Sequence, residues 1–217
     1  DFPDRSEFSV RRKWFNDNIL ASDKVLYHGH AIAAVAAISQ QVADQALAAI
    51  EVDYEELESV TDVLRAMEAD APILHENMFT SGLEETPTTP SNIVQRTQTS
   101  RGDVDARFVE ADVIVERTFV TPMVHQGYIE PHACVGNATE DGQATVWCSS
   151  QGHFDVRSMT ALALGKDLGD IRVIAAEIGG GFGGKTTIYL EPLAVKLSEK
   201  CQRPVKMVMS REEVFRA

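Results

Sequence analysis

Paired cysteines are missing from this sequence of 217 residues. Its three cysteines, Cys134, Cys148 and Cys201, lie far apart and form no C-x-x-C motif. This usage excludes a disulfide framework and provides no cysteine cage for a metal ion or an iron–sulfur cluster. We therefore expect reduced thiols and a cytoplasmic location.

Long apolar runs and an excess of basic residues are missing as well. No stretch approaches the roughly 20 apolar residues that a membrane-spanning helix needs, and the first residues lack the pattern of a signal peptide. The formal net charge of -13 argues against a nucleic-acid surface, which requires a basic face. The sequence predicts no membrane span and no nucleic-acid partner.

The first part of the chain has an α/β rhythm. Apolar segments at residues 25–27, 31–38 and 51–54 predict short strands, and the spacing of apolar residues over 42–49 predicts a helix. Farther on, the periodicity fades and prolines accumulate in the stretch TPTTPSN, which is typical of a linker. We expect three segments, with these bounds: a first domain over residues 1–75, a linker over 76–100 and a second domain over 101–217.

Strands and helices follow one another in the second domain. The patterns predict an amphipathic turn at residues 104–111, helices at 153–164 and 188–199, and strands at 113–121, 133–138, 144–148, 171–176 and 205–209. Glu140, Asp141 and Gly142 predict a hairpin turn, and Gly165 predicts a helix end.

A glycine-rich loop lies between the strand at 171–176 and the following helix. Five of the six residues at positions 179–184 are glycine, and Lys185 and Thr186 follow. The loop fits both the phosphate-binding pattern G-x-x-x-x-G-K-[ST] and the dinucleotide pattern G-x-G-x-x-G. The next strand ends in Ser210 and Arg211, whereas a phosphate-loop NTPase needs an Asp for magnesium and a dinucleotide fold needs an acidic residue. A nucleotide-binding module stays the alternative interpretation.

The physical meaning of these glycines does not depend on either pattern. Glycine permits positive φ and removes side chains, so that backbone N–H groups can point together at an acceptor. Phe182 adds a bulky ring inside the turn. We expect an electron-rich and bulky ligand against residues 179–184.

Three blocks together resemble a known family. The sequence EIGGGFGGK is preceded by Trp147–Gln151 (WCSSQ) and, before that, by residues 124–135 (VHQGYIEPHACV). Their order and spacing resemble the large, molybdopterin-binding subunit of the molybdenum hydroxylases, the group of xanthine dehydrogenase, aldehyde oxidase and carbon monoxide dehydrogenase. The earlier sequence is similar to the α/β-hammerhead domain of that family.

The resemblance implies an α+β fold: the C-terminal part of an α/β-hammerhead domain, then the first part of a molybdopterin-binding domain with mixed sheets and packed helices. It implies a molybdenum-dependent oxidoreductase in which a pterin-bound molybdenum, in some members as a cytosine dinucleotide, hydroxylates an electron-poor carbon. It also implies two [2Fe-2S] clusters and a flavin (FAD), carried by partner domains or subunits, and a small-molecule substrate.

The resemblance also implies the roles of site residues. Gln151 is expected to hydrogen-bond an oxo ligand of molybdenum through its side-chain amide, which donates without adding charge. Phe182 and Gly183 are expected beside the metal and the pterin, offering backbone N–H groups, and Gly180 and Gly181 allow their approach. None of these residues is expected to ligate molybdenum directly.

Two departures from the family pattern limit these implications. Thr186 stands where the xanthine-specific members carry a Glu that contacts purine, so an aldehyde or another heterocycle is at least as good a substrate. The catalytic base of the family is a glutamate near the far C-terminus, which is expected beyond Ala217, so this chain holds no catalytic residue. We expect a fragment of a large subunit that is inactive alone. A non-catalytic assembly module with the same fold stays open.

Other polar residues are weaker candidates. Glu130 and His132 alternate to one face of an expected strand, and we interpret them as structural. His75, His125 and His153 lack the spacing of a zinc site. Lys185 fits either a phosphate contact with the cofactor, a helix cap or a solvent-facing side chain.

Overall fold

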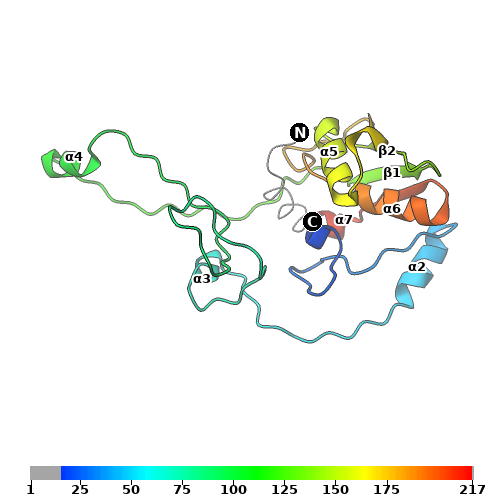
Figure 1. The fold of residues 1–217 in the computed structure, drawn as a ribbon, viewed down its shortest axis with the longest axis horizontal. Coiled ribbons are helices and arrows are strands. Elements are labelled where there is room, and N and C mark those ends of the chain that lie inside the picture. The colour runs from blue at the N-terminus through cyan, green and yellow to red at the C-terminus, as the bar shows by residue number, and fades with distance from the viewer. Residues whose placement is uncertain (1–15, 217) are drawn as a thin grey trace. The chain divides into compact units, whose positions relative to one another are not determined.

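The computed structural model describes residues 16–216, and these form two compact units (Figure 1). The first unit consists of residues 16–52 and 124–216, and the second of residues 53–123. The division predicted from the sequence, with bounds at 75 and 100, stays a prediction, and its first 15 residues lie outside the described range.

A four-stranded sheet with the order β3-β2-β1-β4 forms the centre of the first unit. Strand β1 (Ala133–Ala138) pairs antiparallel with both β2 (Ala144–Cys148) and β4 (Val205–Val208), whereas β2 and β3 (Ile171–Ala175) run parallel. The four strands confirm the predicted ones within one residue. A mixed sheet with packed helices confirms the α+β class.

Alternation along the strands directs one row of side chains to the helices. In β1 and β2 every second residue is buried, among them Cys134, Val146 and Cys148. These side chains form one core with residues of helices α5 (His153–Leu164) and α6 (Glu191–Cys201). Helix α6 lies so close to β1 that a Cβ at Gly136 would stand 2.7 Å from the backbone of Ala194.

The ends of the helices follow from single residues. Helix α5 ends at Gly165. This residue has a φ angle of 67°, in the left-handed region that glycine adopts readily. Helix α6 begins at Glu191, three residues later than predicted, with Pro192 in its first turn, where a missing N–H costs nothing. The 3-10 turn η1 (Leu168–Asp170) precedes β3, and α7 (Arg211–Val214) begins with a capping box at Ser210.

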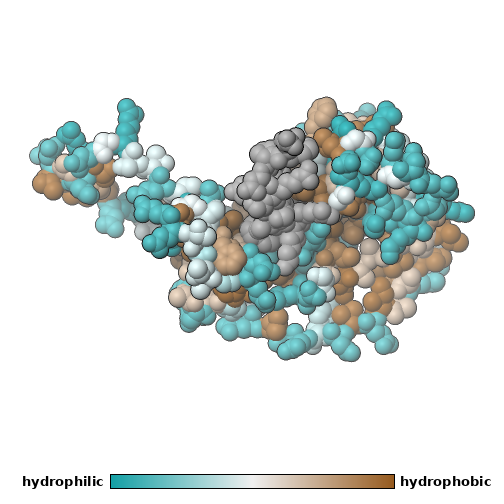
Figure 2. Space-filling view, in the orientation of Figure 1, coloured by the Kyte–Doolittle hydropathy of each residue, from teal (hydrophilic) through white to brown (hydrophobic). Residues whose placement is uncertain are grey.

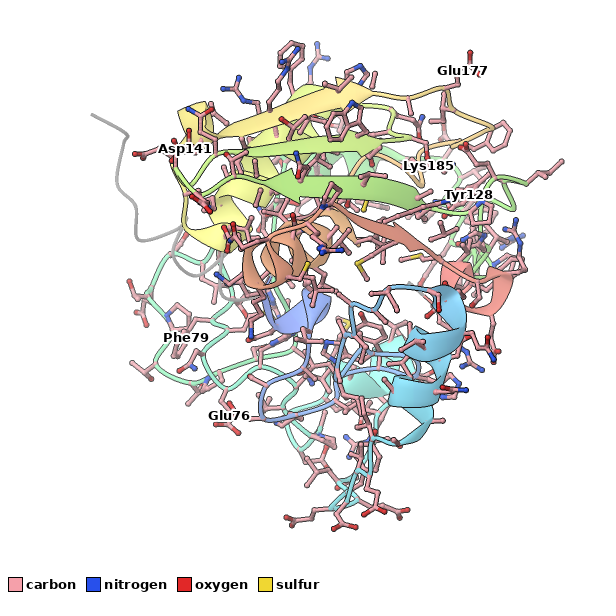
Figure 3. The ribbon with its side chains drawn as sticks, turned by 90° about the vertical axis from the view of Figure 1, so that its right-hand side faces the viewer. Glu76, Phe79, Tyr128, Asp141, Glu177 and Lys185 are labelled. Carbon is pink, nitrogen blue, oxygen red and sulfur yellow. The ribbon has the colours of Figure 1, made fainter. Side chains whose placement is uncertain are left out.

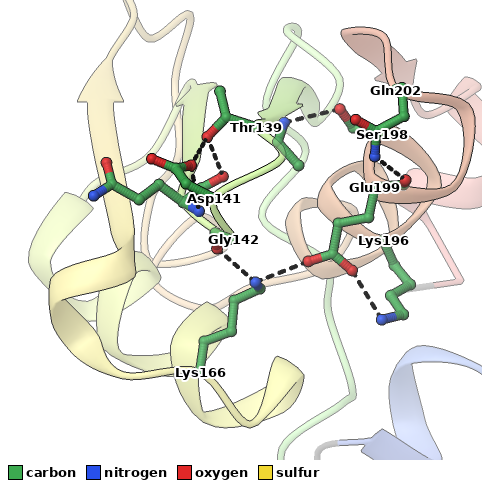
Figure 4. A network of polar contacts seen from close by, with 10 residues as sticks. Thr139, Asp141, Gly142, Lys166, Lys196, Ser198, Glu199 and Gln202 are labelled. Carbon is green, nitrogen blue, oxygen red and sulfur yellow. Dashed lines mark hydrogen bonds and ion pairs between the residues drawn. The ribbon is translucent and has the colours of Figure 1, made fainter.

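Polar contacts connect the β1–β2 turn to both helices (Figure 4). Lys166 donates to the carbonyl oxygen of Gly142 at 2.7 Å and pairs with Glu199 at 2.9 Å. Thr139 Oγ1 donates to Asp141 inside the turn, as the predicted hairpin requires. This network lies at the end of the sheet marked by Asp141 in Figure 3, opposite the end where Lys185 and Tyr128 lie.

The N-terminal part of the first unit contains one helix after residue 20, α2 (Gln40–Ala48), capped by Ser39. The strands predicted at 25–27, 31–38 and 51–54 are wrong, because these segments form no ladder with any described residue. Apolar residues of this part, of α6 and of the turn before α6, including Ile19, Leu193 and Leu190, line a pocket of about 500 Å³. Apolar atoms reach the surface beside α6 in Figure 2. None of the predicted site residues lines this pocket.

The second unit has little regular structure. Its helices are α3 (Val63–Ala66) and α4 (Val104–Glu110), each begun by an Asp side chain that accepts a backbone N–H. The side chain of Asn92 joins its loops, accepting from Leu74 N and donating to Ala66 O and Pro72 O. The strand predicted at 113–121 is wrong: the segment is unpaired within the described chain. No helix among the described residues is long and apolar enough to cross a bilayer.

Candidate cofactor site

Two parallel strands bring the predicted site together. Because β2 and β3 are parallel neighbours, their carboxyl ends meet at one edge of the sheet, which is where open α/β sheets bind ligands. Residues 149–151 follow β2, and the glycine loop follows β3. Gln151 N donates to the carbonyl oxygen of Lys185 at 2.9 Å, and Ser150 Oγ donates to the same oxygen at 3.2 Å. The two predicted blocks therefore form one site.

The glycine loop contains a tight turn from Gly181 to Gly184. Gly184 N donates to Gly181 O at 2.8 Å, and the central residues Phe182 and Gly183 have φ values of 50 and 91. Positive φ at both central positions is the feature of type I′ turns, and it is uncommon for a phenylalanine. Phe182 is 74% exposed, so the turn holds this residue outside the core.

Close packing explains why side chains are missing at two further positions. A Cβ at Gly181 would stand 2.6 Å from Gln151 Oε1, and a Cβ at Gly184 would stand 2.7 Å from Tyr128 Cε1. The glycines therefore let residues 126–128 and Gln151 approach the turn from two sides.

The carboxamide of Gln151 points at the turn. Its Oε1 accepts from Gly183 N at 2.9 Å and from Lys185 N at 3.2 Å. Two backbone donors on one atom fix which end is oxygen. The Nε2 group makes no hydrogen bond to any described residue, and the residue is exposed. Gln151 therefore presents an uncharged donor next to the turn.

Three consecutive backbone N–H groups beside it are open in the sense that no acceptor in the described chain pairs with them. Within residues 16–216, the N–H groups of Gly180, Gly181 and Phe182 have no hydrogen-bond acceptor. Gly183 N–H, which we expected to face a cofactor, donates to Gln151 instead. Phe182 is exposed, Gly180 is half-buried and Gly181 is buried. Unpaired donors in a turn next to a free amide suit a ligand rich in acceptor atoms.

Thr186 and Lys185 differ in exposure. Thr186 is exposed and its Oγ1 donates to Gly183 O at 3.0 Å, so this hydroxyl closes the turn. The Lys185 side chain is only 1% exposed, and its Nζ lies 2.5 Å from Glu130 Oε2. The expectation that Lys185 contacts a phosphate, caps a helix or faces solvent is therefore wrong. Burial of this lysine also argues against the phosphate-loop alternative, as does the helix start at Glu191.

Residues 128–132 form the other side of the loop, where Figure 3 shows Tyr128 beside Lys185. Glu130 and His132 precede β1 instead of lying on a strand. Tyr128 Oη and His132 Nε2 are 2.7 Å apart, and the His132 ring lies 4.4 Å from that of Tyr189. Burial, with a further contribution from the Lys185 charge, lowers the pKa of His132 to about 4. These contacts give His132 packing and hydrogen-bond partners, and the interpretation of both residues as structural stays a prediction.

No metal site made of protein side chains accompanies this arrangement. The described residues contain no group of three or more His, Cys, Asp and Glu side chains that could hold a metal ion.

Comparison with known proteins decides the family. Residues 85–217 match the model of the molybdopterin cofactor-binding domain, and residues 1–58 match the hammerhead domain of aldehyde oxidase and xanthine dehydrogenase. The chain belongs to the molybdenum hydroxylase family. Both domains predicted from the sequence blocks are thereby confirmed in type, although not in their bounds.

Relatives of this molybdenum hydroxylase chain are longer. It is 37% identical to the nicotinate dehydrogenase large molybdopterin subunit of Eubacterium barkeri, over 97% of this chain and 46% of that protein. It is 34% identical to the carbon monoxide dehydrogenase large chain of Afipia carboxidovorans, over 90% of this chain and 25% of that protein. The chain thus spans less than half the length of these relatives.

Solved structures agree with the fold. The Cu,Mo-CO dehydrogenase has a TM-score of 0.74 at 31% identity, covering 94% of this chain and 28% of that one. Quinoline 2-oxidoreductase from Pseudomonas putida 86 has a TM-score of 0.68 at 28% identity, covering 82% of this chain and 21% of that one.

Sequence reasoning missed the groups that support the loop. Tyr128 lies against Gly184, and Glu130 pairs with Lys185 across 55 positions of sequence. The only signal in the sequence was their place in the block VHQGYIEPHACV, which gives no contact partner.

Proposed function

We propose that this chain forms one side of the molybdenum cofactor site of a hydroxylase that oxidises an aldehyde or an N-heterocycle with oxygen derived from water. The observation that carries the proposal is the free Nε2 of Gln151 beside the three open N–H groups of Gly180, Gly181 and Phe182. In a family with a molybdopterin-binding domain, donors of this kind are expected to face the cofactor.

The chemistry of these donors fits the group. A molybdenum centre with oxo ligands and a pterin is anionic and rich in acceptor atoms, and uncharged N–H donors stabilise such charge without a counter-ion. When bound, this group supplies the oxygen nucleophile and takes up the electrons of the oxidation. The residues of this chain bind and orient it.

Each residue has a distinct role in the proposal. Gln151 donates from Nε2 to an oxo ligand, while its Oε1 remains fixed by the turn. Phe182 offers its N–H and places its exposed ring beside the pterin or the substrate. Gly180 and Gly181 contribute N–H groups that have no partner in the described chain, and Gly183 holds Gln151 in place. Thr186, exposed at the end of the turn, faces the substrate.

The substrate class rests on Thr186 and on two relatives. Thr186 stands where a purine-contacting Glu is expected in xanthine-specific members, and the names of two relatives indicate nicotinate and quinoline, both N-heterocycles. A hydroxyl cannot accept two strong hydrogen bonds from a purine as a carboxylate does. An aldehyde or a non-purine N-heterocycle therefore fits better than xanthine.

The proposal assigns the remaining functions to other parts of the enzyme. The base glutamate belongs to the rest of the large subunit, and [2Fe-2S] clusters and FAD belong to partner domains or subunits. The cofactor is a molybdopterin, with or without the cytosine nucleotide, and the enzyme works in the cytoplasm. This chain alone then neither turns over substrate nor retains the cofactor tightly.

The test compares two identical substitutions at opposite ends of one sheet. In the natural protein with its co-purifying chains, Gln151→Glu replaces the Nε2 donor by an oxygen but keeps the acceptor, and Gln143→Glu makes the same change at the β1–β2 turn. We expect wild type and Gln143→Glu to contain molybdenum and to oxidise an aldehyde or nicotinate-type heterocycle with a dye acceptor. Gln151→Glu is expected to lose at least about 100-fold in turnover, the cost of one such donor. Wild-type protein without molybdenum and without turnover would instead favour an assembly module.

A further inference from the structure

We propose that Glu130 is a positioning residue that fastens both ends of the glycine loop, and that this sets the direction of the open N–H groups. The inference rests on the proposed function only for its consequence in cofactor binding. The positioning itself is a property of this chain and can be measured without any cofactor.

One carboxylate oxygen contacts both ends of the loop. Glu130 Oε2 accepts from Gly179 N at 2.8 Å, where the loop begins, and from Lys185 Nζ at 2.5 Å, where the loop ends. The backbone adds a third contact, because Glu130 N donates to Gly179 O at 3.3 Å. The loop residues between these two points, including the three open donors, are therefore held as an arch with fixed ends.

Lys185 depends on this carboxylate. Its side chain is 1% exposed, and within the described chain Glu130 is its sole hydrogen-bond and ion-pair partner. The Tyr128 ring also lies near its ammonium, with the centroid at 5.0 Å. A buried ammonium without its partner carries a large desolvation penalty. If Glu130 loses its charge, the Lys185 side chain has to move towards solvent. This movement displaces the backbone at the end of the turn.

Glu130 is held in place from its other side. Arg211, at the start of α7, donates to the carbonyl oxygens of Tyr128 at 2.9 Å and of Ile129. Gly179 and Glu130 pack closely, since a Cβ at Gly179 would stand 2.7 Å from the Cβ of Glu130. The fixed segment 128–130 thus serves as the anchor, and the loop is the part that adapts.

The pKa of Glu130 agrees with this arrangement. Burial raises its pKa, but the Lys185 hydrogen bond, the Gly179 N–H and the Lys185 charge together outweigh burial, so that the pKa lies below the ordinary value. The carboxylate is therefore charged at neutral pH and available to hold both ends of the loop.

The loop ends bear directly on Gln151. Lys185 N is one of the two donors to Gln151 Oε1, and Gly183 N is the other. A shift of Lys185 weakens both bonds and releases the carboxamide. Glu130 therefore controls the orientation of Gln151 Nε2, although Glu130 itself makes no contact with Gln151 in the described chain.

The experiment uses Glu130→Gln and a matched control, Glu199→Gln. Glu199 forms a comparable pair with Lys166, 22% and 19% exposed, at the opposite end of the same sheet (Figure 4). In the natural protein, hydrogen exchange is followed on peptides that cover residues 177–187 and, separately, residues 133–148. We expect Glu130→Gln to speed exchange at 177–187 by about tenfold, as the loss of a hydrogen bond would do, and to leave 133–148 unchanged. Glu199→Gln is expected to leave 177–187 unchanged.

A second variant separates positioning from stability. Lys185→Met removes the buried charge, so Glu130 keeps only Gly179 N–H and the end of the loop is released without an unpaired ammonium. We expect it to fold, to keep its thermal midpoint near wild type and still to exchange faster at 177–187. The proposal would be overturned if Glu130→Gln and Lys185→Met both exchanged at 177–187 at the same rate as Glu199→Gln. Molybdenum content reports on function independently. If the wild-type protein contains no molybdenum and both variants still exchange faster than wild type at 177–187, the positioning role is retained and the proposed function is rejected.

Discussion

Gln151 and Gly183 are 32 positions apart in sequence and are joined by a hydrogen bond of 2.9 Å from the Gly183 N–H to Gln151 Oε1. The bond exists because β2 and β3 run parallel and end at the same edge. It uses the oxygen of the carboxamide and leaves the nitrogen free. The relationship turns two separate sequence blocks into one surface of uncharged donors.

Gly181→Ala tests this relationship by sterics. The new Cβ would stand 2.6 Å from Gln151 Oε1, the far end of a flexible side chain, so Gln151 is expected to swing away and lose two hydrogen bonds. The free energy of unfolding should fall by about 1–2 kcal/mol, while molybdenum content falls several-fold. Gly169→Ala, with nothing within 4 Å of its Cβ, is the control. Wild-type molybdenum content in Gly181→Ala would contradict the role of Gln151.

Gly136→Ala tests the packing of α6 on β1. Its Cβ would meet the backbone of Ala194 and Val195 at 2.7 Å, where neither strand nor helix can yield locally. We expect the free energy of unfolding, measured with urea, to fall by about 1–3 kcal/mol. An unchanged urea midpoint would mean that the helix lies farther from the sheet.

His132 makes the stability of the first unit depend on pH. Its pKa is about 4 when folded, below the ordinary value of 6.5, so the unfolded chain binds the proton more readily. The stabilisation is complete above pH 6.5 and is lost as the pH falls from 6.5 towards 4, by about 3 kcal/mol in all. NMR titration of the His132 ring checks the pKa directly. A ring that titrates near 6.5 would refute the prediction.

The three cysteines are expected to react in two classes. Burial raises the pKa of the Cys134 thiol, and it raises that of Cys148 to about 12, so neither forms a thiolate near neutral pH. Cys201 is exposed. Alkylation followed by peptide mass mapping should label Cys201 in the native protein and the other two only after unfolding. Rapid native labelling of Cys148 would show that the core opens at this edge.

Local patterns in the sequence were sufficient for the elements that pair with near neighbours. The turn around Asp141 and the alternation on either side predicted β1 and β2, and Gly165 predicted the end of α5. The pattern at 113–121 predicted a strand that is not formed, because alternation specifies an extended backbone but not a partner for its hydrogen bonds. Phe119 is 88% exposed there, so nothing in the unit covers that face.

The sequence proposed the members of the candidate site but could not predict the contacts between them. The family blocks identified Gln151 and the glycine loop, and the strand order brings them together. The use of Gln151 Oε1 for Gly183, and the burial of Lys185 against Glu130, depend on contacts across 32 and 55 positions. No periodicity or local motif carries such information.

The position of the metal tests the central claim most directly. Crystals of the natural protein, loaded with cofactor, can be measured at the molybdenum absorption edge, and an anomalous difference map then locates molybdenum without assumptions about its ligands. We predict a single molybdenum peak beside Gln151 Nε2 and the N–H of Phe182. A molybdenum peak at a site that does not involve the Gly181–Gly184 turn, in protein that oxidises substrate, would contradict the account.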